Sequence, residues 1–325
     1  MKISTVLFLL LLSSSIVAQP VKIIFDADME SDVDDVGALA MLHSFADKGE
    51  VKILATISSS LYPWSAPTID AINTYYGRPD IPIGNVKIKG VYRGSVYAKM
   101  ISEKFPNDIE SGYRAPDAVE IYRKILSEQP DSSVVIVSVG YLTNLSYLLD
   151  SSPDKYSPLN GKELVKKKVK LYICMGGRFP LQQNPEKWGN FKPDPEAAMH
   201  VANAWPTQII FTTGGEFSNM FHTGKILFTD KAEKGNLIAA AYRVFLKGWN
   251  RNYHHSSDLI AVYVAVRGHK PYFKLRKQGY FHIFEDGTQM WRISPDRPNH
   301  HIVTEIADGV DPEDVAADFD KFLIK

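Results

Sequence analysis

The chain has 325 residues, of which 45% are hydrophobic, and its 37 basic and 37 acidic residues give zero formal net charge at pH 7. This hydrophobic content is enough for one large α/β domain or two small ones. A chain with a pI of about 7.1 offers no electrostatic footprint for nucleic acid, so we expect no nucleic-acid partner. The single cysteine, Cys174, excludes an internal disulfide.

Residues 1–18 resemble a secretory signal peptide. Lys2 precedes an apolar core from Val6 to Leu12, and Ala18 provides a small residue at the cleavage position. The apolar core is too short to cross a membrane, and no other segment is apolar enough to do so. We therefore expect a mature domain of residues 19–325, a secreted or periplasmic location, and no membrane partner.

The rest of the chain alternates predicted strands with predicted helices. Strands are predicted at 21–25, 51–58, 80–88 (with a turn), 134–139, 169–175 and 207–213, and a terminal hairpin at 280–293 turning at Asp286-Gly287. Helices are predicted at 34–42, 67–76, 115–129, 142–149, 195–204, 231–249, 259–266 and 310–323. The lysine-rich stretch 162–170 is interpreted as a solvated turn.

The fold class follows from this alternation. The continuous β-branched run at 134–139 is typical of a parallel strand that is covered on both faces. No internal repeat, low-complexity linker or break in charge divides the chain. We therefore predict a single α/β domain with a mostly parallel, Rossmann-like sheet flanked by helices.

An acidic loop directly follows the first predicted strand. Six acidic residues occur within ten positions: Asp26, Asp28, Glu30, Asp32, Asp34 and Asp35. Carboxylates this close repel one another, so folding them into one loop is costly unless a cation neutralises them. In open α/β sheets, ligands bind beyond the carboxyl ends of the strands, which is where this loop falls. The pattern predicts a site for a hard cation.

The acidic loop allows three other interpretations. Acidic runs are usually solvated surfaces, but this one follows a buried strand. An EF-hand requires Gly and Glu at the sixth and twelfth positions, where this loop has Ser31 and Gly37. A strand that ends in Asp-x-Asp also suggests a phosphatase with Asp26 as nucleophile, although that interpretation does not account for Asp34-Asp35.

Short motifs along the chain resemble those of the inosine-uridine-type nucleoside hydrolases. They are Asp26-Ala-Asp28 with Asp34-Asp35, Val139 to Asn144, Met175-Gly176-Gly177, Asn190 with Asp194 to Ala198, Gly215-Glu216 through Thr223-Gly224, and Ser257-Asp258. Their order matches the family over nearly all of the mature chain. The acidic loop is two residues longer than in the best-known members, which resembles a secreted bacterial branch with an extra Asp at the position of Asp32.

The resemblance implies an enzyme with a nucleoside hydrolase fold. Its reaction would be calcium-dependent hydrolysis of the N-glycosidic bond of ribonucleosides or related N-ribosides, giving ribose and free base. By resemblance, the Ca²⁺ ligands are Asp28, Asp35, Asp258 and the backbone carbonyl of Val139. Asp28 would also take the proton of a metal-bound water.

The resemblance also assigns residues to the substrate. Asp34 and Asn190 would hold ribose hydroxyls, and Glu216 is assigned to the substrate site on the same ground. The expected partner is therefore a small nucleoside or riboside. A homo-oligomer is compatible with the sequence.

The chain departs from the family at the substrate side. Ser257 occupies the position of the histidine that protonates the leaving base. His254 and His255 lie just before it and either reach the site as catalytic groups or belong to the plain surface. The sugar-binding asparagine is replaced within a serine run, where Ser60 is the nearest candidate. Trp188 either stacks on a base or packs inside the protein.

The sequence is also compatible with two rival functions. The first is a protein that binds calcium and ribose with little or no turnover, which the loss of the histidine at Ser257 suggests. The second is the phosphatase with Asp26 as nucleophile. Hydrolysis of nucleosides with and without a chelator separates the first from an active hydrolase, and an aryl phosphate tests the second.

Export can be tested directly. When the full chain is made in a Gram-negative host, we expect the mature protein to begin near Gln19, because the preceding residues have the charge, apolar core and small-residue order of a signal peptide. N-terminal sequencing of the purified protein gives the answer. A retained Met1 on cytoplasmic protein would contradict the prediction.

Overall fold

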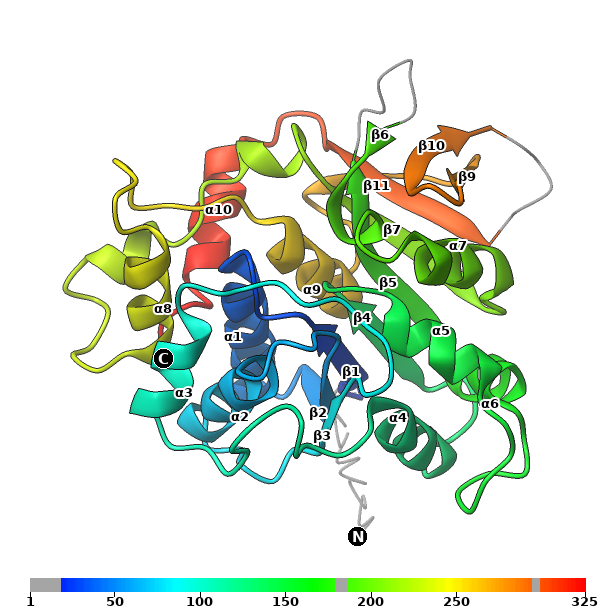
Figure 1. The fold of residues 1–325 in the computed structure, drawn as a ribbon. Coiled ribbons are helices and arrows are strands. Elements are labelled where there is room, and N and C mark those ends of the chain that lie inside the picture. The colour runs from blue at the N-terminus through cyan, green and yellow to red at the C-terminus, as the bar shows by residue number, and fades with distance from the viewer. Residues whose placement is uncertain (1–18, 179–185, 294–298) are drawn as a thin grey trace, which may run out of the picture.

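The computed structural model describes residues 19–178, 186–293 and 299–325, so the predicted signal peptide lies outside it. Its centre is an eight-stranded sheet with the order β3-β2-β1-β4-β5-β7-β11-β8 (Figure 1). All neighbouring strands are parallel except β8, which runs antiparallel to β11. The strands are β1 Val21–Ala27, β2 Val51–Ser58, β3 Ile83–Asn85, β4 Val134–Ser138, β5 Val169–Arg178, β7 Gln208–Gly214, β8 Phe273–Arg276 and β11 His300–Ile306. The predicted α/β domain with a mostly parallel sheet is confirmed.

Helices cover both faces of this sheet (Figure 1). One face carries α1 Asp34–Asp47, α2 Ser65–Tyr75, α3 Ala98–Lys104, α8 Leu237–Phe245, α9 Ser257–Arg267 and α10 Pro312–Asp320. The other carries α4 Ala118–Ser127, α5 Thr143–Asp150, α6 Gly161–Lys168 and α7 Pro195–Ala204. Alternation along β1 feeds both cores, because Ile23 and Phe25 join the first and Ile24 the second. Among the helices of the described ranges, none has the length and apolarity that a membrane span needs.

A small antiparallel sheet lies beside the main one. It consists of β6 Glu186–Lys187, β10 Thr288–Arg292 and β9 Tyr280–Ile283. The predicted hairpin is confirmed as β9 and β10, and Gly287 at its turn adopts a φ of 84°. It is not the last strand pairing, however, because β11 follows it. From β10, Gln289 Nε2 donates to the backbone oxygen of Trp188 over 2.8 Å and so holds the segment that leads to Asn190.

Two local predictions were wrong. The stretch 162–170 is a helix followed by a strand, because Asn160 and Glu163 form a capping box and Leu164 and Val165 are buried. The helix predicted at 231–249 is shorter, since the Asn236 side chain caps the first turn of α8 only at residue 237. The prediction also missed α3, β8 and β11, whose short segments are rich in charged residues or histidine.

The carboxyl ends of the neighbouring central strands β1 and β4 lie close together. Beyond the ladder, the Val139 amide donates to the Asp26 backbone oxygen over 2.8 Å, and the Ser59 amide donates to that of Ala27 over 2.9 Å. Gly140 follows at the point of closest approach. A Cβ there would lie 2.3 Å from Ser59 Oγ and 2.6 Å from the Asp28 nitrogen. Only glycine therefore fits between β4 and the acidic loop.

We expect Gly140→Ala to destabilise the protein by about 1–3 kcal/mol, the usual cost of overpacking, because the clash involves backbone atoms that cannot move aside. Thermal or urea unfolding measures the change. Gly94→Ala is the matched control, since no atom lies within 4 Å of a Cβ at that position. Equal stability of the two variants would contradict the packing argument.

Candidate functional site

The acidic loop is buried at the carboxyl end of β1, in the middle of the sheet. Asp26 and Glu30 are fully buried, and Asp28, Asp34 and Asp35 are at most 5% exposed. The loop turns through Met29, which has a φ of 47°, and then enters α1 at Asp34. The solvated-surface interpretation is therefore wrong, because these carboxylates face inward.

Three of the carboxylates converge with few hydrogen-bond donors between them. One oxygen from each of Asp34, Asp35 and Asp258 lies within 4.8 Å of the others, and all three side chains are buried. Asp258 is in the first turn of α9, and its amide donates to Asp34 Oδ2 over 3.2 Å. Burial and then the neighbouring carboxylates raise the pKa of Asp35 and of Asp258 well above the ordinary value.

This trio fits a hard divalent cation. Asp35 Oδ1 is buried and has no hydrogen-bond partner within the described ranges. Carboxylate oxygens are the donors that Ca²⁺ and Mg²⁺ prefer. Asp28, a predicted ligand, lies outside the trio but within hydrogen-bonding reach of Asp35, and burial together with Glu30 raises its pKa to about 8. A bound dication would stabilise the ionised forms of all four groups.

Asp26 supports the loop from behind. Its Oδ2 accepts hydrogen bonds from Tyr122 Oη over 2.9 Å and from Asn144 Nδ2 over 3.2 Å. Burial raises the pKa of Asp26 to about 7, although these donors oppose the rise. A fully buried carboxylate held by two side chains is poorly placed to attack a phosphoryl group, so the phosphatase interpretation loses its nucleophile.

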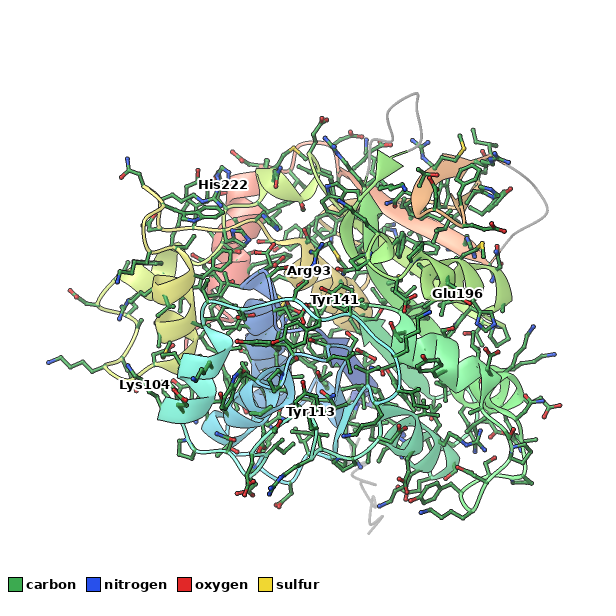
Figure 2. All side chains as sticks on the ribbon, in the orientation of Figure 1. Arg93, Lys104, Tyr113, Tyr141, Glu196 and His222 are labelled. Atoms are coloured by element: carbon green, nitrogen blue, oxygen red, sulfur yellow. The ribbon has the colours of Figure 1, made fainter. Side chains whose placement is uncertain are left out.

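Ser60 acts on the acidic loop through Glu30. The Ser60 hydroxyl donates to Glu30 Oε1, which also accepts the Arg93 amide over 2.9 Å. Tyr141 Oη donates to Glu30 Oε2 over 2.7 Å. Figure 2 shows Arg93 and Tyr141 close together near the middle of the view. Sequence reasoning counted Glu30 only among the six carboxylates of the acidic loop and gave Tyr141 and Arg93 no role; the motif at 139–144 contains Tyr141, but nothing in the sequence pointed to Arg93.

The remaining predicted residues lie near the ends of β4, β5 and β7. The Val139 carbonyl accepts Asn190 Nδ2 over 2.6 Å, and the same nitrogen lies 3.2 Å from the Met175 oxygen. Val139 and Asn190 are therefore brought together. Trp188 instead packs its indole on Gly214, where a Cβ would lie 1.9 Å from the ring. The Glu216 side chain is largely exposed and lies 3.5 Å from Arg178.

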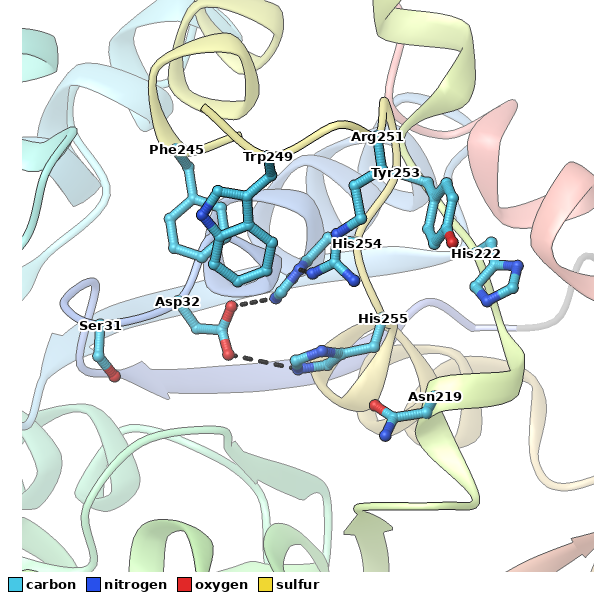
Figure 3. Close-up of a pocket in the computed structure, with 10 residues that line it drawn as sticks. All are labelled: Ser31, Asp32, Asn219, His222, Phe245, Trp249, Arg251, Tyr253, His254 and His255. Carbon is cyan, nitrogen blue, oxygen red and sulfur yellow. Dashed lines mark hydrogen bonds and ion pairs between the residues drawn. The ribbon is translucent and has the colours of Figure 1, made fainter. Parts of the chain in front are cut away.

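The two histidines meet Asp32 at the mouth of the site (Figure 3). His254 Nε2 contacts Asp32 Oδ1, and His255 Nε2 lies 3.3 Å from Asp32 Oδ2 and 3.9 Å from Asp34 Oδ2. Burial disfavours the charged imidazolium of His255, but the Asp34 and Asp32 carboxylates outweigh it and raise its pKa to about 9. The plain-surface interpretation is wrong for His254, whose side chain is only 2% exposed.

A cavity of about 480 Å³ opens beside this pair. Its wall carries aromatic and cationic side chains from the loop between α8 and α9, among them Trp249, Arg251 and Tyr253 (Figure 3). The Arg251 guanidinium lies 4.3 Å from the Trp249 ring centroid and 5.5 Å from that of Tyr253. Ser257 is buried in the first turn of α9. His255, with 28% of its side chain exposed, therefore lines the cavity where Ser257 does not.

Comparison with known proteins gives a consistent family. The family model described as inosine-uridine preferring nucleoside hydrolase matches residues 23–315. A pyrimidine-specific ribonucleoside hydrolase of Salmonella dublin is 29% identical over 195 residues, which cover 55% of this chain and 56% of the relative. The match thus covers 56% of this relative's length, and only 40% of the length of the next relatives, which are also pyrimidine-specific ribonucleoside hydrolases.

Solved structures share the fold over nearly the whole chain. An inosine-uridine preferring nucleoside hydrolase from Bacillus anthracis superposes with a TM-score of 0.68 at 16% identity, covering 93% of this chain and 98% of the other. The plant nucleoside hydrolase PpNRh1 gives a TM-score of 0.67 at 20% identity, with coverages of 94% and 99%. At such low identity these matches establish the architecture alone.

Proposed function

This chain belongs to the inosine-uridine preferring nucleoside hydrolase family, and from that membership we propose that it hydrolyses the N-glycosidic bond of ribonucleosides with the help of Ca²⁺. The observation that carries the proposal is the buried trio Asp34, Asp35 and Asp258, in which Asp34 Oδ2 lies 3.9 Å from Nε2 of the cavity residue His255. The trio supplies oxygen donors only, which favours a hard cation over a transition metal. The proposed substrate is a small nucleoside or riboside.

The ion would be held by Asp28, Asp35 and Asp258 with the Val139 carbonyl, and we add Asp34 to this set because its carboxylate belongs to the trio. When bound, Ca²⁺ would lower the pKa of a coordinated water and fix its position. The orphaned oxygen of Asp35 and the contact between Asp28 and Asp35 support this ligand set.

The side chains near the proposed ion would carry out the other steps of the reaction. Hydrolysis forms a bond between the water oxygen and the anomeric carbon, breaks the bond to the base nitrogen, and passes through an oxocarbenium-like sugar. Asp28 takes the water proton, and its burial beside other carboxylates strengthens it as a base. Asp34 and Asn190 hold ribose hydroxyls. Ser60 contributes through Glu30. Trp188 packs on Gly214 and Glu216 lies beside Arg178, so we assign neither of them a step in the reaction.

The two histidines differ in whether they are placed to protonate the departing base. His254 is buried, with Asp32 on one ring nitrogen and Arg251 on the other, so its role is to hold Asp32. His255 lines the cavity and faces the acidic loop. We therefore assign protonation of the leaving base to His255, and a positioning role to His254.

A family member that binds calcium and ribose without turnover is the alternative. The buried Ser257 at the usual position of the acid favours it, because assistance to the leaving base then depends on a loop residue.

Export through residues 1–18 remains part of the proposal for the active hydrolase. An exported enzyme would act on nucleosides outside the cytoplasm.

The first test is the reaction itself. Incubation with uridine and with inosine should release the free base and ribose in equal amounts, detected by chromatography and a reducing-sugar assay. A chelator should abolish the release, and added Ca²⁺ should restore it. Asp35→Asn should lose most activity, while Asp80→Asn, an exposed turn residue, should keep it. Intact nucleosides after saturating Ca²⁺ would leave the binding protein as the better account.

The second test measures the ion without substrate. Ca²⁺ at a hundredfold excess over its Kd should stabilise the folded protein by about 2.7 kcal/mol, seen as a rise in Tm. Asp35→Asn removes one charge from the trio, so the rise should shrink, whereas Asp80→Asn should retain it. If Asp35→Asn showed the wild-type calcium response, Asp35 would leave the ligand set.

The third test separates the two histidines. His255→Ala should lower kcat/KM for uridine and inosine by about 10²- to 10⁴-fold, because that is what general acid assistance usually contributes. A nitrophenyl riboside, whose leaving group departs unaided, should lose much less. His254→Ala should slow all substrates alike, and His269→Ala, at the far end of α9, serves as control. Equal losses on all substrates for His255→Ala would assign it to binding or packing.

A further inference from the structure

A second group of four side chains converges at this end of the sheet and shares Asp34 with the trio. One ligand atom from each of Asp32, Asp34, His254 and His255 lies within 4.8 Å of the others. We name this set the His–Asp cluster, and we propose that it binds a second divalent cation, a transition-metal ion of the Zn²⁺ type, with Asp34 shared between the two ions. The second site shares Asp34 with the proposed Ca²⁺ site and His255 with the proposed reaction, but binding of the second ion does not depend on hydrolysis.

The donor atoms distinguish the two sites. The trio of Asp34, Asp35 and Asp258 offers oxygen only, whereas the His–Asp cluster adds two imidazole nitrogens. Imidazole suits Zn²⁺ and its neighbours among the transition metals, while Ca²⁺ and Mg²⁺ take oxygen ligands. The chain therefore presents a hard site and a softer site side by side, and the shared carboxylate can bridge them.

The distances fit a four-coordinate ion after a small adjustment. Donors at about 2.0–2.2 Å from tetrahedral zinc lie roughly 3.3 Å from one another. His255 Nε2 is 3.3 Å from Asp32 Oδ2 and 3.9 Å from Asp34 Oδ2. His254 Nε2 and Asp32 Oδ1 contact each other directly and would separate around an ion (Figure 3).

Arg251 would oppose binding of the ion, so a variant without it tests the proposal. Its Nη2 lies 3.3 Å from His254 Nδ1, where it can only donate. A histidine that ligates through Nε2 carries its proton on Nδ1, so Arg251 must turn away when an ion binds. Access is open, because the side chains of His255 and Asp32 are 28% and 36% exposed at the cavity.

The experiment uses Zn²⁺ and Co²⁺ as probes on the full-length mature protein, with Ca²⁺ present in millimolar excess to fill the hard site. Calorimetry should show one Zn²⁺ per chain, and Co²⁺ should give the intense visible bands of a four- or five-coordinate ion. His255→Ala and Asp32→Asn should each weaken Zn²⁺ binding at least tenfold. Arg251→Ala should tighten it.

His222→Ala is the matched control, because His222 lines the same cavity outside the His–Asp cluster. It should bind Zn²⁺ as the wild type does. The inference is overturned if the wild type binds no Zn²⁺, if Co²⁺ stays octahedral, or if His222→Ala removes the site while Asp32→Asn keeps it. Circular dichroism verifies that each variant folds, and two cluster variants guard against the failure of one.

Activity gives a separate readout that rests on the proposed function. A metal ion on His255 Nε2 occupies the nitrogen assigned to the leaving base. Zn²⁺ should therefore slow uridine hydrolysis more than nitrophenyl riboside hydrolysis, and the difference should vanish in His255→Ala. Zn²⁺ binding without any hydrolysis would refute the proposed function alone, and hydrolysis without Zn²⁺ binding would refute this inference alone.

Discussion

The cost of burying ionisable carboxylates at the end of β1 is the constraint on which the rest of this structure depends. A carboxylate loses hydration when it enters the protein, and each neighbour of like charge adds to that cost. Asp26, Glu30, Asp34 and Asp35 are nevertheless almost fully buried. The surrounding chain must therefore supply hydrogen-bond donors, positive dipoles or cations.

The donors are distributed unequally among the acidic residues. Tyr122 and Asn144 serve Asp26, and Glu30 receives one backbone and two side-chain donors. Asp34, Asp35 and Asp258 instead occupy first turns of α1 and α9, where the helix dipole is positive but worth little more than about 1 kcal/mol. The unequal supply explains why a cation fits beside these three and not beside Asp26.

Sequence reasoning predicted most of the elements in their order along the chain, but not the contacts between residues that are far apart in the sequence. The acidic loop and its position after a buried strand could be predicted, because both depend on neighbouring residues. The pairing of Asp34 with Asp258 joins residues 224 positions apart, and only the packing of α1 against α9 creates it. Burial of His254 was likewise hidden, since its partner Asp32 comes from the other end of the chain. Strands β8 and β11 were missed because their charged side chains obscure the alternation.

The division of the site between helices and loops has an evolutionary consequence. The proposed cation ligands Asp35 and Asp258 are fixed to two helices that pack on each other within the core. His255 and Arg251 belong to a loop fastened by the backbone pairing of Thr223 with His254. Mutations in that loop can change the residues that line the cavity while the two buried carboxylates keep their positions. The lining of the cavity can therefore change in evolution while the fold is preserved.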